Sequence, residues 1–97
     1  MSEDEVAPWW LYLLACKNGR TYAGVAIDVH ARFRLHLSGK ASKFTRANPP
    51  LSILGAQMFV NRSAASKAEY ALKQLEKHEK LAWASEHPLL QGSSAGN

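Results

Sequence analysis

The sequence predicts a small α/β domain of the α+β kind, in which a three-stranded sheet with an N-terminal hairpin is flanked by three to four helices. Two strand-like apolar runs, residues 9–16 and 21–26, flank an Asn-Gly pair at Asn18 and Gly19. Such a pair between strand-like runs is the strongest short-range signal for a hairpin. A third apolar run spans residues 51–60, and apolar residues recur at helical spacing after the hairpin and again after the third run.

The size and composition fit one folded domain. The chain has 97 residues, 46% of them apolar, so it can bury roughly 60–70% of its unfolded surface. A single cysteine, Cys16, excludes an internal disulfide and an all-cysteine metal cage. The acidic start is unlike a signal peptide, and no window approaches the ~18 apolar residues of a membrane span. We expect a cytoplasmic protein with no membrane partner, in which residues 9–88 form the domain, residues 1–8 a flexible lead-in and residues 89–97 a disordered tail.

The length of the hairpin loop decides whether Tyr12 and Tyr22 share a face of the sheet. A two-residue loop leaves the two tyrosines on opposite faces, because side chains alternate along a strand. A three-residue loop over residues 17–19 pairs Tyr12 with Gly24 and brings both tyrosines to one face. Local turn rules slightly favour the shorter loop, whereas one shared site requires the longer, with Gly19 in the left-handed conformation. The longer loop is the prediction.

Caps and spacing predict two helices between the hairpin and the third strand. Asp28 is a good N-cap for the first of them. The buried stripe of this helix is expected to comprise Val29, Phe33 and Leu37. The sequence Ser38-Gly39 ends it. Residues 41–47 are expected to form a short, basic second helix that is anchored by Phe44 and broken by the prolines that follow.

A long helix is expected after the third strand, over residues 64–79, with Asn61 or Ser63 as its cap. Gly55 marks a candidate bulge within that strand. The buried stripe of the long helix is expected to comprise Ala64, Ala68, Ala71, Leu72 and Leu75. A further turn or short helix, packed on the core, is indicated by Leu81, Trp83 and Ala84.

Four residues of the hairpin and the first helix have a defined spacing. Tyr12 and Tyr22 lie ten positions apart, Gly24 follows two residues after Tyr22, and Arg32 follows ten residues after Tyr22. This set resembles the signature of the GIY-YIG endonuclease superfamily, and the whole chain looks like its small stand-alone bacterial branch, the YhbQ type. The resemblance covers roughly residues 10–83. It implies a metal-dependent endonuclease that hydrolyses DNA phosphodiester bonds, in repair or in DNA processing.

The chain departs from the family pattern at several positions. Trp10 and Leu11 stand for the glycine and isoleucine of the first motif, and Ala23 stands for the isoleucine of the second. Val25 and Ala26 are apolar where relatives often carry a lysine or threonine, so one polar contact near the phosphate is missing. These departures bear on turnover more than on fold. The alternative interpretations are a catalytically weak or inactive nucleic-acid-binding module, and a protein-interaction subunit.

The resemblance implies a catalytic set comprising Tyr12, Tyr22, Arg32, His36 and Glu69. One tyrosine accepts a proton from the attacking water, and its pKa of ~10 in water must be lowered by a nearby cation unless a metal-bound water is the nucleophile. The Arg32 guanidinium holds the phosphate through two parallel hydrogen bonds. His36, one helical turn later, orients a tyrosine or the water. Without the resemblance, the two tyrosines would be interpreted as packed strand aromatics and Arg32 as the ion-pair partner of Asp28. His36 would be interpreted as a surface histidine.

Glu69 is the metal candidate. The resemblance implies one glutamate on the long helix that binds a single divalent ion, and one carboxylate with several waters suits Mg²⁺, or Mn²⁺. At ~100° per residue, Glu69 lies about 60° from Leu72, at the border of the buried stripe. Ser66 and Glu69 also fit a capping box. That alternative requires a helix start at Lys67, after the stripe has already begun near Ala64.

Positive charge is concentrated in one part of the chain. Residues 17–46 hold seven Lys or Arg against Asp28 alone, a local charge of +6, and the remainder sums to −2. Such a segment predicts a nucleic-acid partner, with DNA favoured, although a solvated basic loop is the plainer interpretation. The expected nucleic-acid contacts are Gly24, Arg34, Lys40, Lys43 and Arg46. The sequence predicts no particular oligomeric state.

Overall fold

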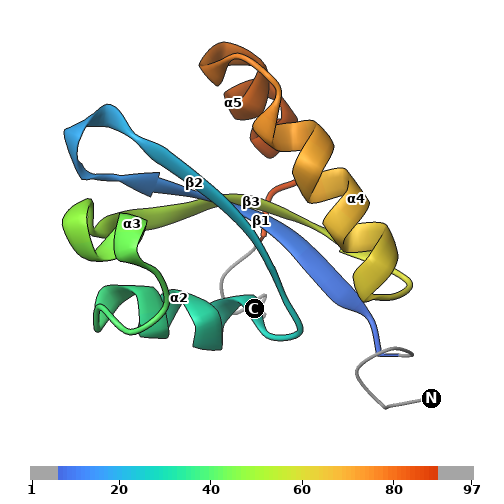
Figure 1. Cartoon of the computed structure of the whole chain (residues 1–97). Coiled ribbons are helices and arrows are strands. Elements are labelled where there is room, and N and C mark those ends of the chain that lie inside the picture. Colours follow the sequence, from blue (N-terminus) through green and yellow to red (C-terminus); the bar gives the residue numbers. More distant parts are fainter. Residues whose placement is uncertain (1–6, 90–97) are drawn as a thin grey trace, which may run out of the picture.

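A three-stranded antiparallel sheet with helices on both faces forms the centre of the protein (Figure 1). The computed structural model describes residues 7–89. Strands β1 (Trp9–Cys16) and β2 (Thr21–Ala26) form the hairpin, and β3 (Pro50–Phe59) pairs with the other side of β1. The strand order is β2-β1-β3, so β1 is central. The predicted fold class is confirmed, while residues 1–6 of the expected lead-in and residues 90–97 of the expected tail lie outside the described part.

The hairpin turns through a three-residue loop, a 3₁₀ turn (η1) spanning Lys17–Gly19. The backbone N–H of Cys16 donates to the carbonyl oxygen of Arg20 at 2.8 Å, and Tyr12 pairs with Gly24. This is the register predicted for the longer loop. Asn18 and Gly19 both have positive φ, at 65° and 69°, which asparagine tolerates better than most residues and glycine adopts freely.

Helices α2 (Val29–Leu37) and α3 (Lys43–Ala47) cover one face of the sheet (Figure 1). The Asp28 carboxylate accepts from the backbone N–H of Ala31 at 3.0 Å and caps α2 as predicted. The predicted stripe is wrong at its last position, because Leu37 is 54% exposed whereas His36 is 1% exposed. Seven residues of helix bring His36 to within about 20° of Val29, whereas Leu37 is rotated by about 80°.

Helices α4 (Arg62–Lys73) and α5 (Lys77–Glu86) cover the other face. The single long helix predicted over residues 64–79 is therefore wrong. The chain leaves the first helix at Gln74, and a capping box between Glu76 and Glu79 starts the second. Asn61 caps α4 through a 2.9 Å hydrogen bond from the backbone N–H of Ala64.

The buried side of α4 also differs from the predicted stripe. Ala65 and Leu72 are buried, whereas Ala71 and Leu75 are exposed. The capping box considered for Ser66 and Glu69 does not form a helix start, because α4 begins at Arg62. The core on this face of the sheet comprises Leu11, Leu13, Ala23, Leu72 and Ala84.

Gly55 allows α5 to pack directly against β3. The pairing of β1 and β3 shifts next to it, since Leu13 faces Gly55 and Leu14 faces Ile53, which confirms the predicted irregularity. A Cβ at position 55 would lie 2.6 Å from the carbonyl oxygen of Ala84. The close approach continues with a 2.7 Å hydrogen bond from the Ala56 backbone N–H to the His87 carbonyl oxygen.

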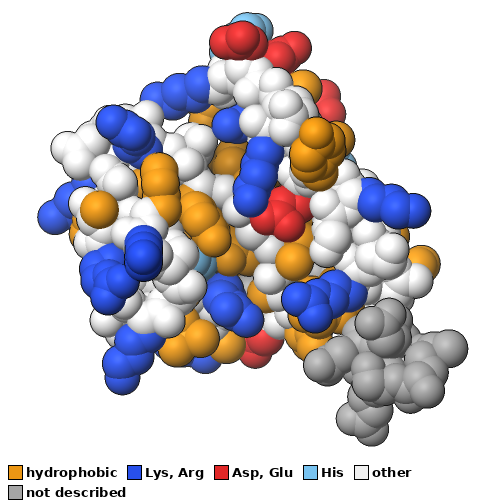
Figure 2. All heavy atoms as spheres, in the orientation of Figure 1, with side chains coloured by type: hydrophobic (Ala, Val, Ile, Leu, Met, Phe, Trp, Pro, Cys, Tyr) orange, Lys and Arg blue, Asp and Glu red, His pale blue; other side chains and the backbone are white. Residues whose placement is uncertain are grey.

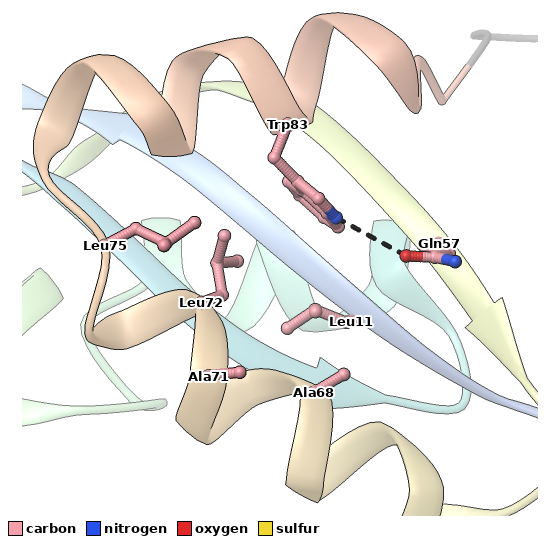
Figure 3. A pocket seen from close by; sticks show the side chains of 7 residues that line it. All are labelled: Leu11, Gln57, Ala68, Ala71, Leu72, Leu75 and Trp83. Atoms are coloured by element: carbon pink, nitrogen blue, oxygen red, sulfur yellow. Dashed lines mark hydrogen bonds between the residues drawn. The ribbon is translucent and has the colours of Figure 1, made fainter.

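An apolar pocket of about 250 Å³ lies between α4, α5 and the sheet (Figure 3). Its lining residues are Leu11, Gln57, Ala68, Ala71, Leu72, Leu75 and Trp83. The one polar contact drawn there is a 3.4 Å hydrogen bond from the Trp83 indole N–H to the Gln57 side-chain oxygen. With no ionisable side chain in its lining, this pocket is not the place for acid–base chemistry. Within residues 7–89, no helix has the length and hydropathy needed to cross a bilayer.

Candidate active site

Three aromatic rings from three elements meet on the face of the sheet that α2 and α3 cover. Because Tyr12 faces Gly24 and Leu14 faces Tyr22, both tyrosines project from this face. The ring centroids of Tyr12 and Tyr22 lie 6.5 Å apart, and the His36 ring lies 5.9 Å from the first and 4.9 Å from the second. The hairpin register thus brings together the two tyrosines and the histidine that the spacing singled out.

Gly24 leaves the space that the Tyr12 phenol occupies. A Cβ at position 24 would lie 2.5 Å from the Tyr12 hydroxyl oxygen and 2.7 Å from Cζ. The sequence predicted Gly24 as a nucleic-acid contact, but the residue is buried beneath Tyr12. In the structure Gly24 is a spacer that makes room for the Tyr12 ring.

His36 is held at both ring nitrogens. Its Nε2 lies 2.9 Å from the Tyr12 hydroxyl oxygen, and its Nδ1 lies 2.7 Å from Thr45 Oγ1. It is not the surface histidine considered as an alternative. Burial, reinforced by the positive charge of Arg32, lowers the pKa of His36 below its ordinary value. His36 is therefore neutral at pH 7 and has one nitrogen that can accept a proton.

Burial and neighbouring charges shift the pKa of the Tyr12 hydroxyl in opposite directions. Burial is the largest influence and raises its pKa, the neighbouring Tyr22 raises it further, Arg32 lowers it and Glu69 raises it. Tyr12 is thus a phenol, not a phenolate, at neutral pH. These influences also show that Arg32 on α2 and Glu69 on α4 act on one hydroxyl although their helices cover opposite faces of the sheet.

Arg32 and Glu69 differ in how they are held. Arg32 is half-buried and forms no ion pair with Asp28; within residues 7–89 the ion pair found joins Lys73 Nζ to Glu69 Oε2 at 2.8 Å. The Glu69 side chain is 21% exposed. A guanidinium without a fixed partner remains available to a phosphate, whereas the Glu69 carboxylate is already partly neutralised by Lys73.

The donor set around Glu69 suits a weakly held magnesium ion. The described residues contain no group of three or more His, Cys, Asp or Glu that could enclose a metal. Mg²⁺ does not need such a cage, since it keeps several waters and commonly binds through one or two carboxylates plus substrate phosphates. Glu69 is an oxygen ligand at a partly exposed position, so the residues present fit this ion. The cation would have to displace or share the carboxylate with Lys73.

Positive side chains gather on one side of the molecule. Figure 2 shows this side, with an acidic side chain near its middle and Lys and Arg to both sides of it. The loop between α2 and α3, together with α3 itself, forms a polar hollow of about 410 Å³, whose lining includes Lys40, Lys43 and Arg46. Phe44 stacks on Tyr22 at 5.8 Å and ties this basic hollow to the site. Arg34 is exposed on α2.

The family model of the GIY-YIG catalytic domain matches residues 8–82. The chain belongs to the GIY-YIG family. The GIY-YIG chain is 46% identical over 91 residues to a UPF0213 protein of Xanthomonas campestris pv. campestris, covering 94% of this chain and 89% of that relative. It is 39% identical over 75 residues to UPF0213 protein YhbQ of Escherichia coli O127:H6, covering 77% and 75%.

A solved structure of a related protein supports the same family membership. The solution NMR structure of the UPF0213 protein BH0048 from Bacillus halodurans shares 33% identity with this GIY-YIG chain and superposes with a TM-score of 0.50. It covers 81% of this chain, which covers 84% of that structure. The spacing of the hairpin and helix residues predicted the superfamily and the look of the whole chain predicted its YhbQ-type branch, and both predictions are confirmed.

Sequence reasoning missed one member of this GIY-YIG site. Thr45 is 1% exposed and contacts His36, although only its neighbour Phe44 was predicted to face inward. Its hydroxyl also lies 2.8 Å from Ser42 Oγ. The available signal was Ser42 three residues before Thr45, since a serine in that position caps a helix. Nothing local revealed that the threonine would meet a histidine from another helix.

Proposed function

We propose that this GIY-YIG protein is an endonuclease that hydrolyses DNA phosphodiester bonds with the help of a divalent metal ion, Mg²⁺ or Mn²⁺. The observation that supports this proposal is the hydrogen bond between the Tyr12 hydroxyl and neutral His36, set within reach of the Arg32 and Glu69 charges. A phenol paired with an imidazole can take up a proton, and phosphoryl transfer needs a proton acceptor and a positive brace. DNA repair or processing is the expected setting.

The proposed reaction is a one-step displacement at phosphorus. The oxygen of a water molecule forms a bond to phosphorus as the bond between phosphorus and the leaving sugar oxygen breaks. The leaving sugar oxygen takes a proton from solvent. The attacking water gives its proton to the Tyr12 oxygen while the Tyr12 proton passes to His36 Nε2, 2.9 Å away. After the step the relay runs back, so that His36 is neutral again and one proton is released to solvent. This relay never requires a free phenolate, which the raised pKa of Tyr12 disfavours.

Arg32, Tyr22 and the basic hollow have separate parts in the proposal. Arg32 braces the phosphate as negative charge builds on its oxygens. The Tyr22 side chain makes ring contacts with its neighbours, and its hydroxyl is available to orient the attacking water. Arg34 and the basic hollow bind the DNA backbone without reading its sequence. Glu69 would hold the metal ion, which when bound supplies charge stabilisation at the phosphate.

The decisive experiment is magnesium-dependent nicking of supercoiled plasmid by the purified chain. Glu69→Gln removes the metal-binding charge at nearly constant shape, so nicking should fall to near background and excess Mg²⁺ should restore part of it. The matched control is Glu86→Gln, an exposed glutamate on α5, which should nick like the parent. The proposal fails if Glu69→Gln nicks as fast as the parent.

A second pair of variants tests the phosphate brace. Arg32→Lys keeps the charge but loses the planar fork, so the rate should fall about 10²–10³-fold without rescue by excess Mg²⁺. Arg20→Lys, at an exposed position beside the hairpin turn, is its control. If the parent binds DNA in a salt-dependent manner but cleaves under no divalent metal, the protein is a binding module.

A further inference from the structure

A chain of hydroxyl groups, buried at Thr45 and partly buried at Ser42, continues beyond His36 into α3. Thr45 Oγ1 lies 2.7 Å from His36 Nδ1 and 2.8 Å from Ser42 Oγ, and it makes a longer contact of 3.5 Å with the Ser42 carbonyl oxygen. Thr45 and His36 are each 1% exposed. Because water has almost no access to these two side chains, each proton on Thr45 Oγ1 and on the His36 ring must be assigned to a protein partner.

Two proton arrangements are consistent with the distances. In the first, His36 carries its proton on Nδ1 and donates it to Thr45 Oγ1, which leaves Nε2 free to accept the Tyr12 hydroxyl proton. In the second, Thr45 donates to an unprotonated Nδ1, and Nε2–H donates to the Tyr12 oxygen. The two arrangements make His36 a proton acceptor or a proton donor toward Tyr12, which are opposite roles.

The contacts of Thr45 favour the first arrangement. There its oxygen accepts from His36 Nδ1–H and from the Ser42 hydroxyl, and its own hydrogen is donated to the Ser42 carbonyl oxygen. All three contacts of Thr45 Oγ1 are then used. A threonine hydroxyl in a helix commonly bonds a carbonyl three or four residues back, as here. In the second arrangement the threonine hydrogen goes to His36 and the carbonyl contact carries no hydrogen bond.

We propose that Thr45 is a positioning residue that holds His36 as its Nδ1–H tautomer, so that Nε2 faces Tyr12 as a proton acceptor. This assignment deepens the proposed function and rests on it for the catalytic consequence. The tautomer itself does not rest on that function, because it follows from the hydrogen bonds of Thr45 and His36 alone. Ser42 extends the effect, since its hydroxyl supports the Thr45 oxygen and its side chain also caps α3 through the Thr45 backbone N–H at 3.1 Å.

The test is a pair of substitutions read by imidazole nitrogen NMR above the pKa of His36. Parent spectra should show the Nδ1–H tautomer. Thr45→Val keeps the side-chain shape without the acceptor oxygen, so the Nδ1–H population should fall, whereas Thr45→Ser keeps the hydroxyl and should retain it. In plasmid nicking, Thr45→Val should lose about 10- to 100-fold in kcat with little change in KM, by analogy with the loss seen when the orienting partner of a metal-bound histidine is removed. Thr45→Ser should recover most of that loss.

The outcomes separate this inference from the proposed endonuclease function. An Nε2–H tautomer in the parent, or an unchanged tautomer in Thr45→Val, overturns the inference whatever the activity. A parent that never cleaves DNA but shows the Nδ1–H tautomer, lost in Thr45→Val, overturns only the proposed function. The parent spectrum needs no variant, so it decides the tautomer even where Thr45→Val does not fold.

Discussion

Substitution of Gly24 by alanine should disable the site while leaving the fold in place. Position 24 lies in β2 with an ordinary strand conformation, and alanine adds a single methyl group. That methyl carbon would lie 2.5 Å from the Tyr12 hydroxyl oxygen and 2.7 Å from Cζ, where ordinary contacts are 3.4–4 Å. The perturbation is therefore aimed at one phenol, and it reaches the chemistry through the Tyr12–His36 hydrogen bond.

The geometry gives the size of the effect. The Tyr12 phenol must retreat by roughly 1 Å, which is the kind of overpacking that costs about 1–3 kcal/mol of stability. Tyr12 and His36 are both buried, at 2% and 1% exposed, so His36 cannot follow and their 2.9 Å hydrogen bond is broken. A positioned acid–base group contributes about 10²–10⁴ in rate. We expect nicking to fall by about 10²-fold or more per folded molecule.

Gly55→Ala is the matched control. It also adds a methyl group to a buried sheet glycine, and its Cβ would meet the Ala84 carbonyl oxygen at 2.6 Å. It lies where α5 packs on β3 and should cost at least as much stability. Plasmid nicking and urea unfolding of both variants, at a temperature where both are folded, should show activity loss for Gly24→Ala alone. In a Tyr12→Phe background, Gly24→Ala should add little further loss.

Two results would refute this reasoning. Parental nicking by folded Gly24→Ala would mean that the Tyr12–His36 hydrogen bond is not needed for cleavage. An equal loss per folded molecule in Gly55→Ala would mean that activity follows general stability and not the position of the phenol.

Three further predictions concern the charges of the site. Lys73→Gln frees the Glu69 carboxylate from its 2.8 Å ion pair. Half-maximal nicking should then need a Mg²⁺ concentration lower by up to about fivefold, which corresponds to the interaction energy of an exposed ion pair. An unchanged Mg²⁺ titration would speak against metal binding at Glu69. Reversal of charge at Lys40, Lys43 and Arg46 should lower DNA affinity and leave cleavage at saturating DNA unchanged. The slope of log affinity against log salt concentration should become shallower by about 0.9 for each phosphate that these side chains no longer neutralise. An unaltered affinity would mean that the DNA-binding surface lies elsewhere. Burial lowers the pKa of His36 from the ~6.5 of the unfolded chain, so the contribution of neutral His36 to the free energy of unfolding is complete above about pH 6.5 and is lost as the pH falls through the folded pKa. Urea unfolding should therefore show a smaller loss of stability toward acid pH in His36→Gln than in the parent, whereas the exposed-site control His78→Gln should lose as much as the parent.

Local chemistry made much of the fold predictable. Asp28 and Asn61 cap their helices because a short polar side chain reaches the backbone N–H three residues on. The hairpin register followed from Gly19 and from the requirement that Tyr12 and Tyr22 share a face. The break between α4 and α5 did not follow, since Gln74-Leu75-Glu76 contains neither glycine nor proline and glutamate is not among the preferred caps.

The site was less predictable, because its contacts join separate elements. A stripe of apolar residues favours Leu37 over His36, since hydropathy treats histidine as polar and cannot know that Tyr12 and Thr45 will satisfy both ring nitrogens. The influence of both Arg32 and Glu69 on the pKa of Tyr12 is likewise a property of the assembled sheet, since their helices lie on opposite faces. The sequence spacing alone could select these residues, but it could not show which of their side chains are in contact.

The buried polar groups of the core lie on one face of the sheet. On the α4 and α5 side the core is apolar. On the α2 side it holds a buried polar chain from Tyr12 through His36 to Thr45. A fully bonded polar group adds little net stability over an apolar group of the same shape, whereas losing one partner of a buried pair is costly. Stability alone therefore gives no reason to bury this chain. Its presence in a domain of 97 residues fits the proton transfer proposed for this face, and replacing all of its members together by apolar groups of the same shape is expected to cost that function before the fold.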